Sequence, residues 1–483
     1  MRFEMDRRTI LKVGGASALT LGLGVAPSAA APRKGGRLRV ATTGGAISDS
    51  LDPATLPDYM TFLISWACRN NLVEIDEKGN AIPELATSWE PSADARTWKF
   101  EIRKGVEFHN GKSLVAEDVI YSINYHRGEA SRSAVNVLVA PIQDMQADGD
   151  HRVIFTLGGP NADFPYLLSD QHLVIAPTGT SGKDWEQCIG TGGYVITDWQ
   201  PGQSALMTRN PNYWKPDRAH FDEVEILGIS DVAARTNALV SGEVDLINNP
   251  DLRTAHMLNR LGDLQLIDVP GGGFGSLPMN VNVSPFDDTD VRLALKYAID
   301  REEMVQKVLY GHGVVGNDHP IASTYRYHAA DMPQRSYDPD KAKFHLKKAG
   351  LSSLSVDLST SGVAFNGAVD AAVLFKETAH KAGIDINIVR EPDDGYWSEV
   401  WMKKPFCVSH WNGRSTEDWI LSIIFGADSP WNESYWKNPR FNSLLREARA
   451  ELDDVKRREL YNEMQLIVRD EGGGTSSRSS TIT

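Results

Sequence analysis

Cysteine is scarce in this chain of 483 residues, and the few positions exclude one class of protein. Only Cys68, Cys188 and Cys407 are present, an odd number at wide spacing. Small secreted domains that depend on disulfides carry an even set of closely spaced cysteines. A disulfide framework is therefore excluded, although one bridge remains open to the chain in an oxidising compartment. The fold must depend on its apolar core.

Long apolar runs are also rare. The one uncharged stretch near bilayer length covers residues 13–31, and no later run approaches it. With 41% hydrophobic residues the chain has the composition of a soluble protein, and 483 residues are too many for a single core. We therefore expect two or three domains, an arrangement that permits a binding cleft between them.

A surplus of positive charge is absent. Lys and Arg number 50 against 64 Asp and Glu, which gives a formal net charge of −14. Such an acidic surface repels the phosphates of nucleic acids and anionic lipid headgroups. We therefore expect no nucleic acid among the partners.

Motifs of enzyme chemistry are missing as well. The chain has no nucleophile elbow, no phosphate-binding glycine loop and no zinc-ligand spacing such as His-Glu-x-x-His. The string GGGFGS at residues 271–276 lacks the third glycine of a dinucleotide fingerprint, so a flexible crossover or close backbone packing explains it better. The sequence predicts no catalytic residue, no metal and no cofactor.

The N-terminus has the pattern of an export signal. Arg7 and Arg8 precede the weakly hydrophobic run 13–31, which contains the small residues Ser28 and Ala30. This order is typical of secretory leaders, and adjacent arginines are typical of the twin-arginine route. A membrane anchor is the alternative, but four glycines weaken the run and it has no cysteine to carry a lipid. We predict that residues 1–30 are removed and that the mature protein works in the periplasm without inserting into the membrane.

After this leader, the hydrophobic pattern changes along the chain. Residues 60–185 indicate a mixed, partly antiparallel unit, in which alternation on either side of Lys104 and Gly105 predicts a hairpin. From residue 224 onward, strand patterns alternate with helix patterns that end at glycine. Such units build a mainly parallel sheet covered by helices, so we expect an α/β fold. A helical segment at 291–310 restarts at Asp300, which can cap a second helix.

Aromatic residues are concentrated toward the C-terminus, where six tryptophans lie between residues 397 and 436. Flat and rigid aromatic rings line small-molecule pockets well. Trp401 and Trp436 are better explained as core residues. Trp411 differs, because the Gly, Asn and Ser around it in SHWNGRS (409–415) indicate a loop, where binding groups are commonly presented.

Several strings between about residue 35 and residue 471, in order and spacing, resemble the solute-binding proteins of peptide- and nickel-type ABC importers. This is the dipeptide/oligopeptide-binding family, bacterial extracellular solute-binding protein family 5. The strings are LDP (51–53), PELATSW (83–89), KGVEFHNG (104–111), AEDV (116–119), NPNYW (210–214), SGEVD (241–245), PFDD (285–288), VR (291–292) and AIDR (298–301).

The resemblance implies a two-lobed periplasmic binding protein, type II and peptide-binding-like, with an extra subdomain inserted in lobe I. Its lobes close by a hinge over a small solute, which passes unaltered to the permease subunits of an ABC transporter in the inner membrane. No enzyme activity is expected, and we expect a monomer. The expected domains are the lobe I core (31–62 and 186–276), the inserted subdomain (63–185), lobe II (277–471) and a disordered tail (472–483).

One position departs from the peptide-binding relatives, in which an Asp after a Trp-x-Gly pattern holds the amino terminus of the peptide. Here Trp411, Asn412 and Gly413 are followed by Arg414. A guanidinium pairs with carboxylate or phosphate and not with an ammonium group. We therefore expect an anionic ligand, peptide-like or carboxylated and opine-like, although Asp418 could serve as an amine partner, or Arg414 could simply bridge to a neighbouring acid. The other ligand-binding candidates are Trp431, Asn432, Ser361, Gly45 and Ser48.

The C-terminal end departs from the family pattern too. The Gly/Ser/Thr-rich residues 472–483 cannot bury a core, and the segment with which relatives return to the first lobe is missing.

Two alternatives to a transport receptor stay open. One is a secreted hydrolase of a small peptide-like substrate, which the missing nucleophile disfavours, and the other is a binding protein that partners a chemoreceptor.

Overall fold

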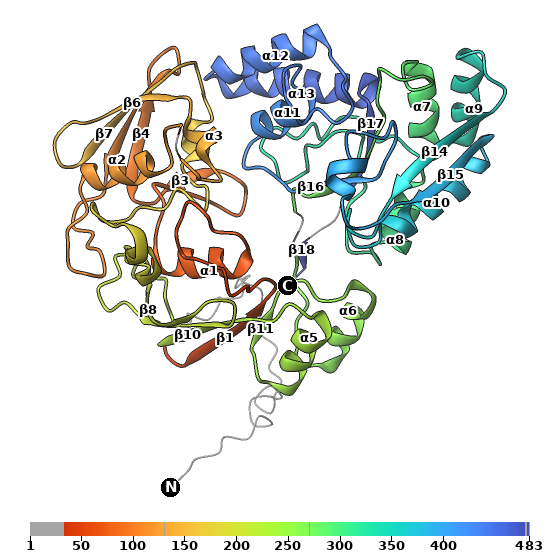
Figure 1. The fold of residues 1–483 in the computed structure, drawn as a ribbon. Helices are drawn as coiled ribbons and strands as arrows, with labels where there is room; N and C mark the ends of the chain where they lie inside the picture. The colour runs from red at the N-terminus through yellow and green to blue at the C-terminus, as the bar shows by residue number, and fades with distance from the viewer. Residues whose placement is uncertain (1–32, 130, 270, 479–480, 483) are drawn as a thin grey trace, which may run out of the picture.

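The computed structural model describes residues 33–483 except 130, 270, 479–480 and 483, so the predicted leader lies outside the described residues. The chain forms two lobes side by side, with the short strand β18 (Thr481–Ile482) between them (Figure 1). In the part of the chain that is described, no helix has both the length and the apolar character needed to cross a bilayer.

A five-stranded sheet organises the first lobe, in the order β11-β1-β10-β9-β8. Strand β1 (Arg37–Thr42) runs parallel to β10 (Glu223–Gly228), which pairs antiparallel with β9 (Ser204–Arg209). Apolar side chains of these strands pack against α1 (Tyr59–Cys68) in one core cluster. The other elements of this lobe core are β8 (Tyr194–Gln200), β11 (Leu246–Ile247), α5 (Val232–Ser241), α6 (Leu252–Leu258), η3 (Asn259–Leu261) and β12 (Asp268–Val269).

A second sheet, β4-β5-β7-β6, has its own apolar core. Strand β5 (Thr97–Ile102) buries alternate side chains, as predicted. The predicted hairpin partner at 106–108 is wrong, because β4 (Ala86–Pro91) and β7 (Arg152–Leu157) occupy the two edges of β5. The remaining elements here are β2 (Val73–Ile75), β3 (Ala81–Pro83), α2 (Ala116–Tyr125), α3 (Asn136–Val139), β6 (Ile142–Ala147), α4 (Phe164–Leu167) and η2 (Gly182–Gln187). The boundaries 63–185 for an inserted subdomain stay a prediction.

The second lobe is built around a parallel strand pair. Strands β14 (Leu354–Thr360) and β15 (Ile384–Arg390) are connected by α10 (Ala368–His380), which is the predicted strand-helix-strand unit. One large apolar cluster joins this unit to the neighbouring helices. The other elements of the lobe are α7 (Thr289–Ala298), α8 (Arg301–Lys307), α9 (Pro339–Lys348), the π-helical turn η4 (Tyr396–Val400), α11 (Glu417–Phe425), α12 (Pro439–Ala450) and α13 (Asp454–Glu471).

Helix ends follow the local sequence signals. The Asp300 side chain accepts a hydrogen bond from the Glu303 amide and starts α8, which confirms the predicted restart. Gly242 closes α5 with a φ of 76°, a left-handed conformation in which glycine has no Cβ penalty. These boundaries need no distant contact, which is why the sequence predicts them.

The C-terminal residues form strands in the described structure. Strand β13 (Phe274–Pro278) pairs with β16 (Ser409–Trp411) on one edge and with β17 (Gly474–Arg478) on the other. Strand β18 pairs with β12. The prediction of a disordered tail at 472–483 is therefore wrong for the paired residues. Ladder pairing uses backbone amides and carbonyls, so a Gly/Ser/Thr composition does not prevent it.

Candidate functional site

The loop after β16 lies where lobe II meets the crossover from lobe I. A Cβ on Gly413 would lie 2.9 Å from the Cα of Gly272, a distance that real Cβ atoms do not show. The amide of the next residue, Arg414, donates a hydrogen bond of 2.9 Å to the hydroxyl of Tyr325. Close backbone packing, one of the two explanations for the glycine string at 271–276, is therefore confirmed at Gly272.

Four tryptophans form a row beside this loop. Ring centroids are 6.0 Å apart between Trp397 and Trp401, 6.1 Å between Trp401 and Trp411, and 6.2 Å between Trp411 and Trp431. Trp411 is only 6% exposed, whereas Trp397 and Trp431 keep 42% and 45% of their surface accessible. The row thus ends in open aromatic faces on which a planar or apolar part of a ligand can stack. Trp436 lies in the core, as predicted.

A buried acid supports this row, and sequence reasoning missed it. The carboxylate of Glu433 accepts a hydrogen bond of 2.7 Å from the indole nitrogen of Trp401 and one of 2.8 Å from the hydroxyl of Ser409. Ser276, on β13, donates a third at 2.9 Å. Burial raises the pKa of the Glu433 carboxyl, and these donors oppose the rise. The acid orients the Trp401 ring and joins strands β13 and β16, because Trp401, Ser276 and Ser409 all donate to it.

Arg414 carries the half-buried charge of the loop. Its Nη1 donates to the carbonyl oxygens of Asn412 and Gly413 at 3.0 and 3.2 Å, and the guanidinium lies 5.4 Å from the ring centroid of Trp419. Burial lowers the pKa of Arg414, while Tyr325 and Asp170 oppose that change. Among the residues that the structure describes, no carboxylate forms an ion pair with Arg414. Within the described residues, the loop therefore presents a cation that Asp170 influences electrostatically but with which no carboxylate forms an ion pair.

The Asp418 carboxylate is paired with Arg449 and is therefore not free to bind an amine of a ligand. Its two oxygens accept from Nε of Arg449 at 3.1 and 3.2 Å, and the side chain is largely buried at the start of α11. Burial raises the pKa of Asp418 and Arg449 opposes the rise. The acid is already paired, which weighs against a role as an amine partner.

The other candidates are divided between structural and open positions. Asn432 is buried and donates to the Trp436 carbonyl oxygen at 2.7 Å, which is a structural role. Ser361 is buried and donates to Asp393. Gly45 has a φ of 99° and donates its amide to Asp58, and a Cβ there would lie 2.8 Å from the carbonyl oxygen of Gly202. Ser48, in the same loop, is exposed.

The two lobes also touch on the side of the second sheet. Trp419 of α11 packs against the core of that sheet, and the Ala162 amide donates to the Arg449 carbonyl oxygen at 2.9 Å. Asp170, from the same region of the first lobe, acts electrostatically on Arg414. The candidate loop is therefore near three parts of the chain at once: lobe II, the crossover and the second sheet.

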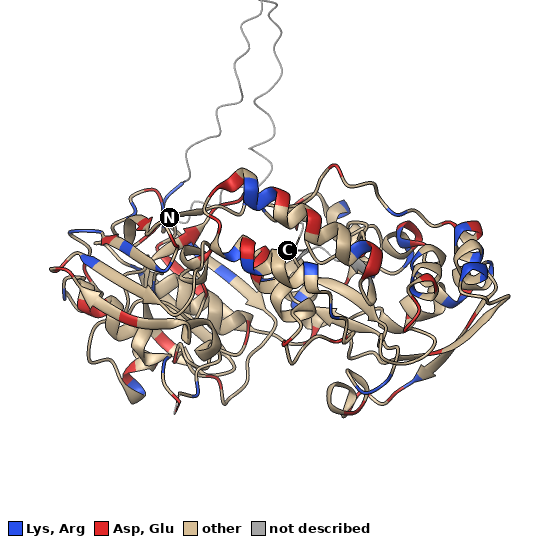
Figure 2. Cartoon of the chain, turned by 90° about the horizontal axis from the view of Figure 1, so that it is seen from above, with Lys and Arg blue, Asp and Glu red and all other residues tan. Residues whose placement is uncertain are grey.

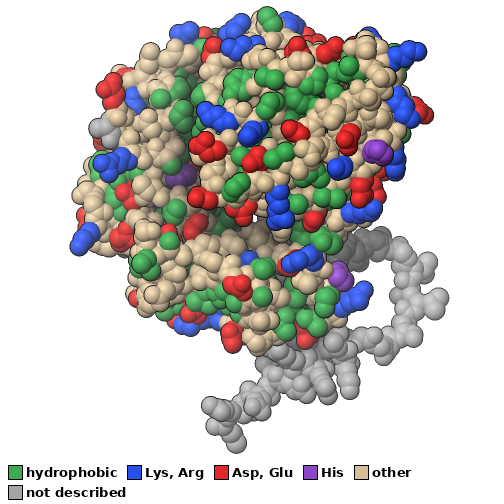
Figure 3. Space-filling model, turned by 45° about the vertical axis from the view of Figure 1, so that its right-hand side comes forward, with side chains coloured by type: hydrophobic (Ala, Val, Ile, Leu, Met, Phe, Trp, Pro, Cys, Tyr) green, Lys and Arg blue, Asp and Glu red, His purple; other side chains and the backbone are tan. Residues whose placement is uncertain are grey.

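The surface as a whole carries mixed charge. Acidic and basic residues are interspersed over both lobes (Figure 2), and one face is hollowed between its upper and lower parts (Figure 3). A mixed surface lacks the single-sign basic stripe by which nucleic-acid-binding proteins are recognised. Within the described ranges, no three His, Cys, Asp or Glu side chains gather as metal ligands would.

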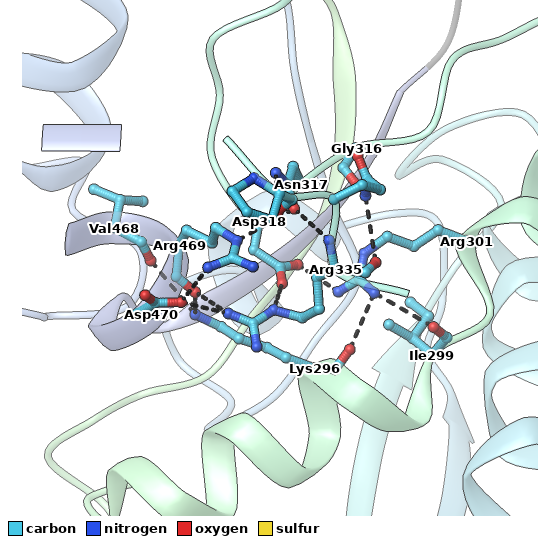
Figure 4. Close-up of polar contacts among 12 residues, drawn as sticks. Lys296, Ile299, Arg301, Gly316, Asn317, Asp318, Arg335, Val468, Arg469 and Asp470 are labelled. Carbon is cyan, nitrogen blue, oxygen red and sulfur yellow. Dashed lines mark hydrogen bonds and ion pairs between the residues drawn. The ribbon is translucent and has the colours of Figure 1, made fainter. Parts of the chain in front are cut away.

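A cluster of charged side chains in lobe II serves the fold. Arg301 and Arg335 both pair with the buried Asp318, and Lys296 donates to the carbonyl oxygen of Arg469 at 2.9 Å (Figure 4). Cations at the last carbonyls of a helix are favourable, since those groups have no partner within the helix. The AIDR string at 298–301 is thereby explained by structure.

Two α/β lobes with a row of tryptophans beside the segment that joins them form an architecture that can hold a small solute. The sequence model of the bacterial extracellular solute-binding proteins, family 5 Middle, matches residues 80–433, and the chain belongs to this family. Family membership confirms the resemblance found in the sequence. Because the members of this family are binding proteins, it also confirms the expectation of a receptor without enzyme activity.

Named relatives agree with this class. Di/tripeptide-binding protein 3 of Pseudomonas aeruginosa is 28% identical over 457 residues, which cover 86% of this chain and 84% of that protein. The dipeptide-binding protein of Escherichia coli is 28% identical over 456 residues, with 86% and 84% covered. Both relatives are named as peptide-binding proteins.

Two solved structures show the same fold. The periplasmic binding protein DppA from Helicobacter pylori, in complex with the peptide STSA, has a TM-score of 0.73 at 24% identity and covers 93% of this chain and 94% of its own. The unliganded open form of MppA, a periplasmic murein tripeptide-binding protein, has a TM-score of 0.80 at 21% identity, with 94% and 93% covered. The expected two-lobed binding-protein fold is confirmed.

Proposed function

We propose that this protein captures a small anionic solute, peptide-like or carboxylated and opine-like, and delivers it to the permease of an ABC importer. The mature receptor works as a monomer in the periplasm after export by the twin-arginine route. The observation that carries the ligand class is the guanidinium of Arg414, which forms no ion pair with a carboxylate among the described residues and lies over the ring of Trp419. The names of the peptide-binding relatives support the peptide-like part of the proposal.

The surroundings of Arg414 suit a carboxylate. Nη1 of Arg414 donates to the carbonyl oxygens of Asn412 and Gly413. These bonds fix the plane of the guanidinium before a ligand arrives. A carboxylate accepts two parallel N–H bonds from such a fork, and the partial burial strengthens the attraction. The open faces of Trp397 and Trp431 provide apolar contact for the rest of the ligand.

Isothermal calorimetry on the mature protein tests the ligand class. Dipeptides, their C-terminally amidated forms and opines are titrated into the wild type, Arg414→Gln and the control Arg218→Gln, an exposed arginine outside the loop. We expect carboxylate ligands to lose about tenfold or more in affinity with Arg414→Gln. The amidated ligands should bind both proteins equally, and Arg218→Gln should bind as the wild type does.

A wild-type affinity in Arg414→Gln for every carboxylate ligand would overturn the proposal. If binding requires a free amine on the ligand and tolerates amidation of its carboxylate, the site recognises a cationic group and not an anionic one. The twin-arginine route is tested separately by replacing Arg7 and Arg8 with lysines, which should leave the protein in the cytoplasm.

A further inference from the structure

The second sheet is connected to lobe I by two chain segments, and each ends in a cysteine. Cys68 is the last residue of α1, before the chain enters the second sheet. Cys188 directly follows η2, where the chain returns to lobe I. Both side chains are 0% exposed and belong to the same core cluster. We call these two segments the neck.

Backbone contacts press the two sides of the neck together. The Gly192 amide donates to the Cys68 carbonyl oxygen at 2.9 Å, and a Cβ on Gly190 would lie 2.3 Å from the same oxygen. Arg69, next in the chain, donates from Nη2 to the Trp185 carbonyl oxygen at 2.9 Å. Glycines on one side and a buried arginine on the other thus hold residues 188–192 directly against the end of α1.

The two thiols belong to the same buried cluster within this packing. Both thiols are free and buried in the structure, and Sγ of Cys68 lies 3.6 Å from Sδ of Met207 in that cluster. Cys407 lies in the core cluster of lobe II and is separate from both. Among three cysteines, the fold therefore brings together one pair and leaves one thiol by itself.

We propose that Cys68 and Cys188 form a disulfide in the exported protein. Two S–H bonds break and one S–S bond forms, and the two protons and two electrons pass to a disulfide oxidant, either a protein dithiol-disulfide oxidoreductase or an oxidised small thiol. The oxidant loses its own disulfide and leaves as two thiols. Exported proteins meet such oxidants, and local opening of the neck exposes the buried pair to them.

The bridge has a clear mechanical consequence. It closes a loop that contains the whole second sheet, so it restricts the unfolded chain over a long segment. It also ties the second sheet to the lobe I core at the point where both chain crossings meet. The two units then move as one body when the lobes close.

Thiol counting on the full mature protein, purified from the periplasm without reductant, tests the proposal. The denatured protein is alkylated with iodoacetamide and weighed before and after reduction. We expect one alkylated cysteine without reductant, at Cys407, and three after reduction. Peptide mapping should recover Cys68 linked to Cys188, and Cys407→Ser should keep this link.

Stability measurements supply a second readout. Reductant should lower the Tm of the wild type and of Cys407→Ser by about 5 °C or more, and should leave Cys68→Ser/Cys188→Ser unchanged. Three alkylated cysteines in unreduced wild type, after incubation with oxidised glutathione as well, would overturn the proposal even if the variants fail to fold. Neither result bears on the ligand titrations, so the two proposals stand or fall separately.

Discussion

Asp163 and Arg457 form a buried ion pair across the two lobes. Nη1 and Nη2 of Arg457, on α13, donate to the two carboxylate oxygens of Asp163 at 2.8 and 2.7 Å. Both side chains are 3% exposed. Burial alone would lower the pKa of Arg457, but the Asp163 carboxylate outweighs burial and raises it. Arg326, also in the second lobe, donates to the same carboxylate at 2.9 Å, so one acid holds two cations.

Removing the charge of Asp163 should separate or destabilise the lobes. In Asp163→Asn, two arginines lose their counter-charge while still buried, which typically costs about 3–5 kcal/mol. We expect a lower free energy of unfolding in urea, together with a larger radius of gyration by X-ray scattering if the lobes part to hydrate the arginines.

Asp148→Asn is the matched control, because its carboxylate is 55% exposed and pairs with Arg152 at the surface. Such pairs contribute little, so this variant should stay within about 0.5 kcal/mol of the wild type. Equal behaviour of the two variants would show that the interlobe pair does not hold the lobes.

Lys296 should make stability depend on pH. Burial lowers the pKa of this lysine to about 7, although Asp318 opposes the change. Its pKa in the folded protein is below the value of 10.5 for an unperturbed lysine, so the unfolded chain binds more protons between these values and stability rises with pH. Relative to Lys296→Met, the wild type should gain about 1.4 kcal/mol per pH unit across this window.

Urea unfolding at several pH values between 6 and 10 measures this difference. The control is Lys348→Met, which removes a lysine that is 59% exposed on α9. Parallel curves for the wild type and Lys296→Met would mean that the lysine keeps its proton throughout.

The contact between Gly272 and Gly413 should not tolerate a methyl group. In Gly413→Ala the new Cβ would be 2.9 Å from the Gly272 Cα, so the loop that carries Arg414 must move. Overpacking of this kind typically costs about 1–3 kcal/mol. We expect a lower Tm and weaker ligand binding by calorimetry. Gly159→Ala is the control, since a Cβ there meets no atom within 4 Å, and an unchanged Gly413→Ala would show that the loop adapts.

Strand β17 should protect its amides from exchange with solvent. It is paired with β13 over five residues, so its hydrogen-bonded amides open only with the sheet. Hydrogen exchange followed by mass spectrometry should show slow uptake in the peptide that contains β17. Deuterium uptake at the rate of an unstructured peptide would show that this segment is disordered, as its composition predicts.

Local signals were predictable because they act over a few residues. Asp300 caps a helix through the amide three positions later, and Gly242 ends one through its own φ. The loop after Trp411 was predicted in the same way, from the small and polar residues beside it, but Trp411 itself ends strand β16 and is buried, so its own placement in a loop was wrong. Strand pairing was not predictable from local signals. Strand β5 pairs with β4 and β7, and β7 lies about fifty residues later in the chain.

The sequence by itself determined the class of this protein, the order of its strand and helix units, and the arginine that follows the Trp-x-Gly pattern at 411–413. The tertiary structure alone decided which groups meet: Glu433 with Ser276, Trp401 and Ser409, Asp163 with Arg457, and Cys68 with Cys188 in one buried cluster. Helix and turn preferences depend on neighbours in the chain, whereas burial and pairing of polar groups depend on which segments the folded core brings together.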